Sequence, residues 1–131
     1  MRWKGTRNLL LVVGLAVVLS GCKVNSEAVQ VIQSIRVYPG LTWVSERSVG
    51  GDETEPPTGY EITYASRFEA QTVRDYYSLT MNQDGWMVAE SRSPSDGGEA
   101  FLLRMRKGSY VATITANQAE PKHVVVRVER E

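Results

Sequence analysis

The chain has 131 residues, a length typical of a single domain. It contains 15 basic and 15 acidic residues, one cysteine and one histidine. This balance of charge argues against a nucleic-acid-binding protein, which usually carries a basic patch. A single cysteine excludes an internal disulfide framework, and a single histidine makes a zinc or copper site unexpected.

The first 21 residues have the three-part layout of a secretory signal. A short basic region comes first and holds Arg2, Lys4 and Arg7. An uncharged apolar run over 9–19 follows, and Ser20 and Gly21 supply small residues for cleavage. The run is about half of the ~20 residues that a membrane-spanning helix needs. A cleaved signal is therefore favoured over a retained transmembrane anchor.

The stretch Leu19-Ser20-Gly21-Cys22 resembles the lipobox of bacterial lipoproteins at all four positions. The resemblance implies cleavage between Gly21 and Cys22, a diacylglyceryl group on the Cys22 sulfur, and a further acyl chain such as palmitate on the new N-terminus. Several acyl chains hold a protein stably on a membrane, whereas one holds it only marginally. The resemblance also implies a location in the bacterial cell envelope, at the outer face of the cytoplasmic membrane or at the outer membrane, facing the periplasm. Lys23, where an aspartate is associated with inner-membrane retention, favours the outer membrane.

Removal of this signal peptide changes the charge of the protein. Residues 22–131 keep 12 basic and 15 acidic residues, a net charge of −3. With Cys22 acylated, no cysteine remains for a disulfide, a redox pair or a metal site. The mature chain is long enough to be stabilised by its own core.

Residues 22–37 fit two patterns, and a piece this short does not decide between them. One set shares the parity of a strand: Val29, Val31, Ile35 and Val37. Another set fits the stripe of a helix: Ala28, Val31, Ile32 and Ile35. We interpret 22–37 as a lipidated tether that leads into one domain over 38–131. Tyr38-Pro39-Gly40 indicates a turn before a short strand over 41–44.

The next segment, 45–58, is rich in glycine, proline and acidic residues and is predicted to be a solvated loop. Its acidic cluster of Asp52, Glu53 and Glu55 raises the hypothesis of a calcium site, because oxygen ligands suit calcium. The spacing is not that of an EF-hand loop, and clustered like charges usually stay solvated. No metal site is therefore expected.

One amphipathic helix is predicted at about 67–84. Tyr60, Ile62 and Tyr64 alternate with polar residues and indicate a strand before it. Ser66-Arg67-Phe68-Glu69 has the pattern of a capping box. Apolar residues then recur at spacings of three and four, at Ala70, Val73, Tyr77 and Met81. Gly85 is expected to end the helix in a left-handed conformation, with Trp86 packing against Met81.

Four further strands are predicted over 86–90, 100–106, 110–116 and 124–128, the last three with apolar residues at every second position. Short connections between them favour an antiparallel meander. The expected fold is α+β, with four to five of these segments forming an antiparallel sheet that is packed by the one helix.

A second resemblance rests on Tyr38-Pro39-Gly40, then Val73, Tyr76-Tyr77, Met81 and Gly85-Trp86. This order is similar to a YPG…YY…GW pattern in small uncharacterised bacterial lipoproteins, over about residues 37–128. The resemblance implies the fold and the envelope location, and it brings no activity.

No catalytic set is visible in the sequence. His123 is the sole imidazole, and no serine lies in a G-x-S-x-G pattern. We expect no catalytic residue, no metal and no cofactor. The aromatic residues offer the main potential for binding, and we select Trp43 and Tyr76 as a possible binding surface. Tyr76 and Tyr77 lie 100° apart on a helix, so one of them is expected to face outward.

The expected function is therefore that of a lipid-anchored, non-enzymatic binding or scaffolding domain, held on the membrane through Cys22. Its expected partner is an envelope protein rather than nucleic acid. A cell-wall glycan-binding module is the alternative, because aromatic rings stack on sugars. A small carboxylate-dependent hydrolase is the third hypothesis.

Overall fold

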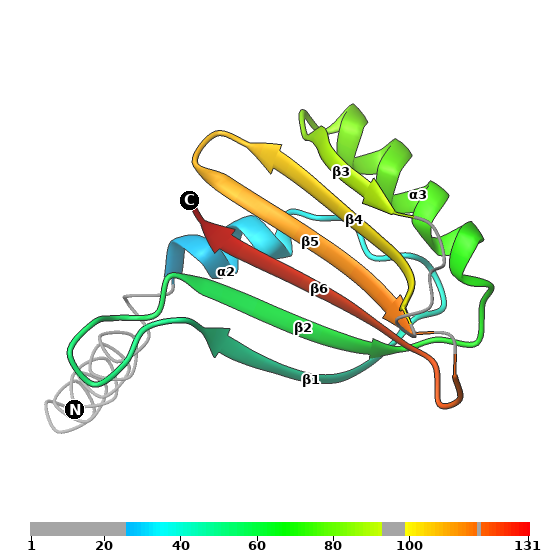
Figure 1. Cartoon of the computed structure of the whole chain (residues 1–131), viewed down its shortest axis with the longest axis horizontal. Helices are drawn as coiled ribbons and strands as arrows, with labels where there is room; N and C mark the ends of the chain where they lie inside the picture. Colours follow the sequence, from blue (N-terminus) through cyan, green and yellow to red (C-terminus); the bar gives the residue numbers. More distant parts are fainter. Residues whose placement is uncertain (1–25, 93–98, 118) are drawn as a thin grey trace, which may run out of the picture.

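The computed structural model describes residues 26–92, 99–117 and 119–131. In chain order, the elements of these residues are α2 (Ser26–Gln33), β1 (Thr42–Val49), β2 (Gly59–Ala65), α3 (Ala70–Gln83), β3 (Met87–Arg92), β4 (Glu99–Lys107), β5 (Tyr110–Asn117) and β6 (His123–Arg130) (Figure 1). The expected signal peptide and the stretch that resembles a lipobox lie outside the described residues.

The strands form one antiparallel sheet in the order β1-β2-β6-β5-β4-β3. Strands β3 to β6 form a meander, as the short connections predict, and β6 then pairs with β2. Both helices pack on the same face of this sheet, α2 over β2 and β6 and α3 over β3, β4 and β5 (Figure 1). The α+β class is confirmed.

The expected number of four to five strands is wrong, because the sheet has six. The prediction ended the first strand at residue 44 and assigned 45–58 to a loop, whereas β1 continues to Val49 and pairs with β2 along its length. Seven of its eight residues are exposed. A strand at the edge of a sheet needs no apolar alternation, so its polar sequence resembles that of a loop.

The start of α3 also differs from the prediction. The helix spans 70–83 instead of 67–84, and its N-cap is Glu69, whose side chain makes no capping hydrogen bond. The Ser66 hydroxyl accepts a hydrogen bond from the Phe68 amide at 3.1 Å, so the predicted capping box does not form. Serine side chains often form such hydrogen bonds with nearby backbone amides, and here the resulting turn precedes the helix.

The end of α3 is as predicted. The Trp86 N–H donates to the Met81 carbonyl at 2.9 Å, and the Gly85 N–H donates to the Asn82 carbonyl at 3.1 Å. These are the two hydrogen bonds of a Schellman motif, and Gly85 has the positive φ of 98° that the motif requires. The motif turns the chain so that Trp86 enters the core.

The folded domain begins before residue 38, within the range 22–37 that is expected to be a tether. Within that range Ser26–Gln33 forms α2, so the helical pattern is the one adopted. Ala28, Ile32 and Ile35 are buried and belong to the hydrophobic core. A sheet of six strands is wider than one helix can cover, and α2 shields the part over β2 and β6. The folded domain therefore reaches back to Ser26.

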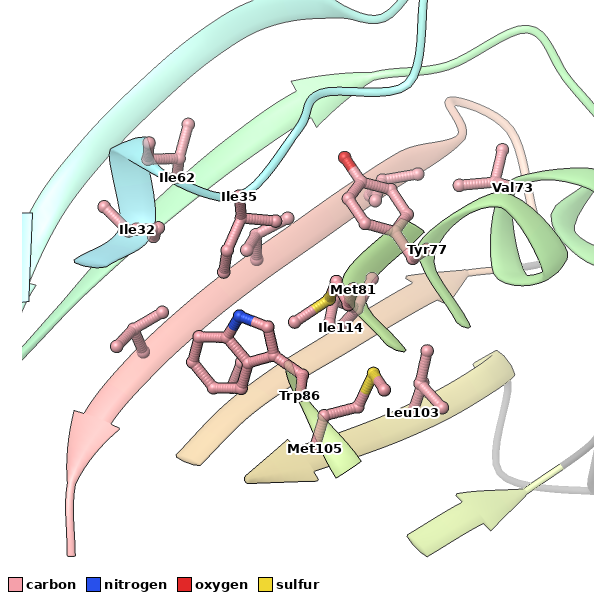
Figure 2. Close-up of a cluster of buried hydrophobic side chains, with 14 of the residues drawn as sticks. Ile32, Ile35, Ile62, Val73, Tyr77, Met81, Trp86, Leu103, Met105 and Ile114 are labelled. Atoms are coloured by element: carbon pink, nitrogen blue, oxygen red, sulfur yellow. The ribbon is translucent and has the colours of Figure 1, made fainter. Parts of the chain in front are cut away.

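The core lies between the two helices and the sheet. Figure 2 shows Met81 of α3 and Trp86, which follows the helix, beside Met105 and Ile114 from the sheet. The same view shows Ile32 of α2 and Ile35, which follows that helix. Burial of each large apolar side chain contributes about 1.5–3 kcal/mol. Because the core uses side chains from both helices, α2 contributes to the stability of the domain.

Candidate functional site

The proposed lipid attachment site precedes the described residues by a short stretch of sequence. Three residues, 23–25, separate Cys22 from Ser26, the first residue of α2. Within 26–92, 99–117 and 119–131, neither helix has the length and apolar character needed to cross a bilayer.

The predicted binding residue Trp43 lies on β1 and is 56% exposed. Its indole Nε1 donates to Oε1 of Glu46 at 2.9 Å. The other oxygen of the same carboxylate accepts a hydrogen bond from the hydroxyl of Tyr60 on β2. Tyr64 pairs directly with Trp43 across the two strands, and burial, together with the Glu46 charge, raises the pKa of the Tyr64 hydroxyl. The indole ring is thus held in place by a carboxylate while much of its surface remains in solvent.

Large exposed apolar side chains concentrate at the two edges of the sheet. Of the described residues, the large apolar side chains that are exposed are Val37, Trp43, Val44, Leu79, Met87 and Val88. Trp43 and Val44 lie on β1, while Met87 and Val88 lie on β3. Within the described part of the chain, the outer side of β1 carries no neighbouring strand. The backbone of β1 is therefore open to a further strand.

The second predicted binding residue, Tyr76, packs within the protein. It is half-buried on α3, and its ring lies 5.1 Å from that of Tyr38 and 5.6 Å from that of Tyr77. Its hydroxyl donates to the Val37 carbonyl at 3.3 Å. These contacts hold the segment after α2 against α3. Trp43 instead contacts Glu46, so the two predicted residues make their contacts with different partners.

Tyr77 belongs to the core, as its place in the apolar stripe predicts. Its side chain is 0% exposed, and its hydroxyl accepts a hydrogen bond from the Tyr38 amide at 3.4 Å. Burial disfavours the phenolate and raises the pKa of Tyr77 well above its ordinary value. Tyr77 therefore stays protonated at neutral pH and acts as a structural residue.

A cavity of about 240 Å³ opens at the end of the sheet where β2 ends and β6 begins. We call it the end pocket. Its apolar wall is formed by Phe68, Ala70, Val73, Ala100, Ala116 and Val124. Polar side chains at its boundary include those of Lys122, His123 and Glu69. An apolar hollow with a few polar groups is the usual form of a small-ligand site.

The turn beside the end pocket is held by Asn117. Its amide oxygen accepts a hydrogen bond from the His123 N–H at 2.6 Å, and its amide nitrogen donates to the carbonyls of Ala119 and Pro121, each at 3.0 Å. These bonds fix the backbone that places His123 at the pocket. Asn117 thus has a structural role.

The loop that carries the acidic cluster of the calcium hypothesis forms hydrogen bonds to one of its members, Asp52. One oxygen of Asp52 accepts hydrogen bonds from the Thr54 hydroxyl and amide, both at 2.7 Å, and from the Glu55 amide at 2.8 Å. These bonds, the Thr54 hydroxyl first, lower the pKa of Asp52. In the described ranges, no three His, Cys, Asp or Glu residues are grouped so that they could hold a metal ion.

No family model matches the chain, and neither does any curated protein or any solved structure.

Sequence reasoning missed the end pocket and the open edge of β1. The pocket is lined by residues from four segments spread between positions 66 and 124, so no local motif indicates it. The register shift between Trp43 and Ser45 interrupts the alternation along β1. A strand signal was present in residues 42–44, but the polar residues that follow concealed its length.

Proposed function

We propose that the chain is a lipid-anchored lipoprotein of the bacterial cell envelope whose folded domain is a non-catalytic module that binds a protein partner along β1. The lipobox supports the anchor. The open edge of β1 supports the mode of binding, and it is the observation on which the binding role depends.

An exposed edge strand can pair with an extended segment of a partner through backbone hydrogen bonds. β1 has eight residues, long enough for such a ladder. The side chains of Trp43 and Val44 would add apolar contact area, because they are 56% and 44% exposed.

Charged side chains on an edge strand usually discourage pairing with other chains. On β1 both nearby charges have partners within the protein. Glu46 accepts hydrogen bonds from Trp43 and Tyr60, and Arg47 forms an ion pair with Glu61 at 2.9 Å. These contacts direct both charges onto the faces of the sheet, so the backbone edge is less protected than its sequence suggests.

The end pocket supports a binding role over hydrolysis. Glycoside hydrolysis uses a pair of carboxyl groups on either side of the bond. Among the described residues that line the end pocket, Glu69 is the sole carboxylate. The described lining of the end pocket therefore gives no support to the third hypothesis, a carboxylate-dependent glycosidase at this site.

A matched pair of variants tests the β1 interface. Val44→Lys adds a positive charge to β1, and Val88→Lys adds the same charge to β3, at a position of similar exposure, 50% against 44%. A photo-reactive residue at position 45 would capture the partner in intact cells. We expect Val44→Lys to abolish the cross-linked product and Val88→Lys to preserve it. Equal capture by both variants would contradict the proposal.

Trp43 favours a second candidate, binding of cell-wall glycan. A solvent-exposed indole whose orientation is fixed offers a flat apolar surface to a sugar ring, together with neighbouring polar groups. The unlipidated variant Cys22→Ser should then co-sediment with purified peptidoglycan. Trp43→Ala should remove that binding, while Leu79→Ala, at another exposed apolar position, should retain it. Unchanged binding by Trp43→Ala would exclude this candidate.

A further inference from the structure

One end of the domain contains the start of α2, the connection 50–58 and the turn 107–109. We call this the anchored end. Glu27 on the first turn of α2 forms an ion pair with Arg130 at the end of β6, with 3.5 Å between Nη1 and Oε2. A cavity of about 180 Å³ at this end is bounded by Glu27, Pro56, Pro57 and Tyr110. Figure 1 shows that the first residues of α2 lie at this end of the sheet.

The distance from the lipid to this end is limited by the chain. Four Cα–Cα steps join Cys22 to Ser26, and each step spans at most ~3.6 Å. The start of α2 therefore lies within about 14 Å of the Cα of the lipidated residue.

The sheet is longer than the distance of about 14 Å that the link between Cys22 and Ser26 can span. β6 runs from Arg130 at the anchored end to His123 at the end pocket. Its length is about 24 Å at ~3.4 Å per residue. A link this short limits the range of positions that the domain can take relative to the bilayer.

We infer that the anchored end faces the lipid headgroups and that the end pocket is held on the side of the domain away from the bilayer. The inference depends on the proposed lipidation of Cys22. The surface that meets the membrane consists of the connection 50–58 and the turn 107–109 at the anchored end. The end pocket and the turn that contains Ala119 are then presented to the periplasm.

The cations of the described residues near the anchored end have partners within the protein. Arg130 pairs with Glu27, Arg106 pairs with Glu131 at 3.2 Å, and the Lys107 ammonium donates to the Asp84 carbonyl at 2.7 Å. Two of these three cations are paired with carboxylates, so attraction to anionic lipid adds less to the orientation than the short link does. The orientation should consequently change little with salt concentration.

Fluorescence quenching in vesicles tests this orientation with the full lipidated protein. Because the lipid occupies Cys22, an introduced cysteine is the one thiol that can be labelled. Glu53→Cys places a dye in the connection 50–58, and Ala119→Cys places it beside the end pocket, both at exposed positions. The vesicles contain phosphatidylethanolamine and phosphatidylglycerol with a nitroxide on some headgroups. We expect the dye at position 53 to be quenched several-fold more than the dye at position 119.

A longer link provides the control. Twenty Gly/Ser residues inserted after Asn25 would have an r.m.s. length of about 25 Å, comparable with the sheet. The contrast between the two dyes should then largely disappear. Equal quenching at both positions with the native link, or stronger quenching at position 119, would overturn the orientation.

Two further measurements show whether an unexpected quenching result contradicts the orientation or the proposed lipidation of Cys22. Flotation with vesicles and the mass of the N-terminal peptide report whether Cys22 carries lipid. Lipidated, floating protein with equal quenching contradicts the orientation alone. Protein that neither floats nor carries lipid contradicts the proposed anchor, and the orientation with it.

Discussion

The indole N–H of Trp43 donates to the carboxylate of Glu46 at 2.9 Å, three residues further along the same edge strand. Tyr60 on the neighbouring strand donates to the second oxygen of that carboxylate. One acidic side chain therefore orients an exposed aromatic ring and is itself drawn onto the face of the sheet. This contact leaves the backbone edge of β1 accessible, as strand addition by a partner requires.

Replacement of Glu46 by alanine should release the Trp43 ring. We expect increased quenching of Trp43 fluorescence by acrylamide and weaker partner capture, with a loss of about 1 kcal/mol or less in the free energy of unfolding. In the chain that the proposed cleavage would leave, the other tryptophan, Trp86, is only 2% exposed and should contribute little to the change.

Arg47→Ala is the control for this measurement. It removes the neighbouring charge, which pairs with Glu61 instead of holding the indole. Acrylamide quenching should stay at the level of the unmodified protein. A similar increase for both variants would show that the Glu46 carboxylate does not hold the ring.

The helix α2 should be required for stability. Ile32 is 3% exposed and packs in the core, so Ile32→Ala should lower the free energy of unfolding by about 2–5 kcal/mol. Gln30→Ala changes an exposed position on the same helix and should have little effect. Urea unfolding of the Cys22→Ser protein measures both. Equal stability of the two variants would show that residues 26–35 behave as a tether in solution.

Tyr77 should make the protein sensitive to alkaline pH. Burial raises the pKa of Tyr77 in the folded state above the ordinary value of ~10 in the unfolded chain. The unfolded chain therefore loses this proton first. The contribution of the Tyr77 proton to the free energy of unfolding is complete below pH ~10. It declines as the pH rises further, by at most ~1.4 kcal/mol per pH unit.

Tyr77→Phe keeps the buried ring and removes this titration. The free energy of unfolding of the variant should fall less steeply between pH 10 and 12 than that of the unmodified protein. Some slope should remain, because burial also raises the pKa values of Tyr64 and Tyr110. Identical slopes for the two proteins would contradict a protonated, buried Tyr77.

Gly85 should be required for the end of α3. Its φ of 98° lies in the left-handed region, where an alanine side chain is strained by roughly 1–2 kcal/mol. Gly85→Ala should lower the thermal unfolding midpoint. Gly108→Asn is the control, because φ at Gly108 is 60°, an added Cβ would meet nothing within 4 Å, and asparagine tolerates this conformation. A larger loss for Gly108→Asn would contradict the proposed role of the Schellman motif.

The parts of the fold that could be predicted have strong local signals. Gly85-Trp86 specifies the end of α3 through backbone hydrogen bonds that depend on a few adjacent residues. The meander from β3 to β6 follows from regular apolar alternation and short connections. Both features are local in sequence, so they can be recognised before the tertiary structure is known.

The remaining elements depend on tertiary context. The stretch that forms α2 fits strand and helix patterns equally well, and packing of Ile32 and Ile35 over β2 and β6 selects the helix. β1 is polar because the two helices pack over the other strands and leave its side chains exposed. Tyr76 could face outward by helical geometry, but Tyr38 covers its ring. The sequence selects Trp43 only as a possible binding residue, whereas its exposure on β1 and its contact with Glu46 follow from the structure.

The central claim, that this domain is held on a membrane by Cys22, is tested most directly by mass spectrometry of the mature N-terminal peptide isolated from the native host. The proposed anchor predicts a peptide that begins at Cys22 and carries a diacylglyceryl group on the sulfur, with a further acyl chain on the amine. A mature protein with an unmodified Cys22, or one that retains residues 1–21, would contradict it.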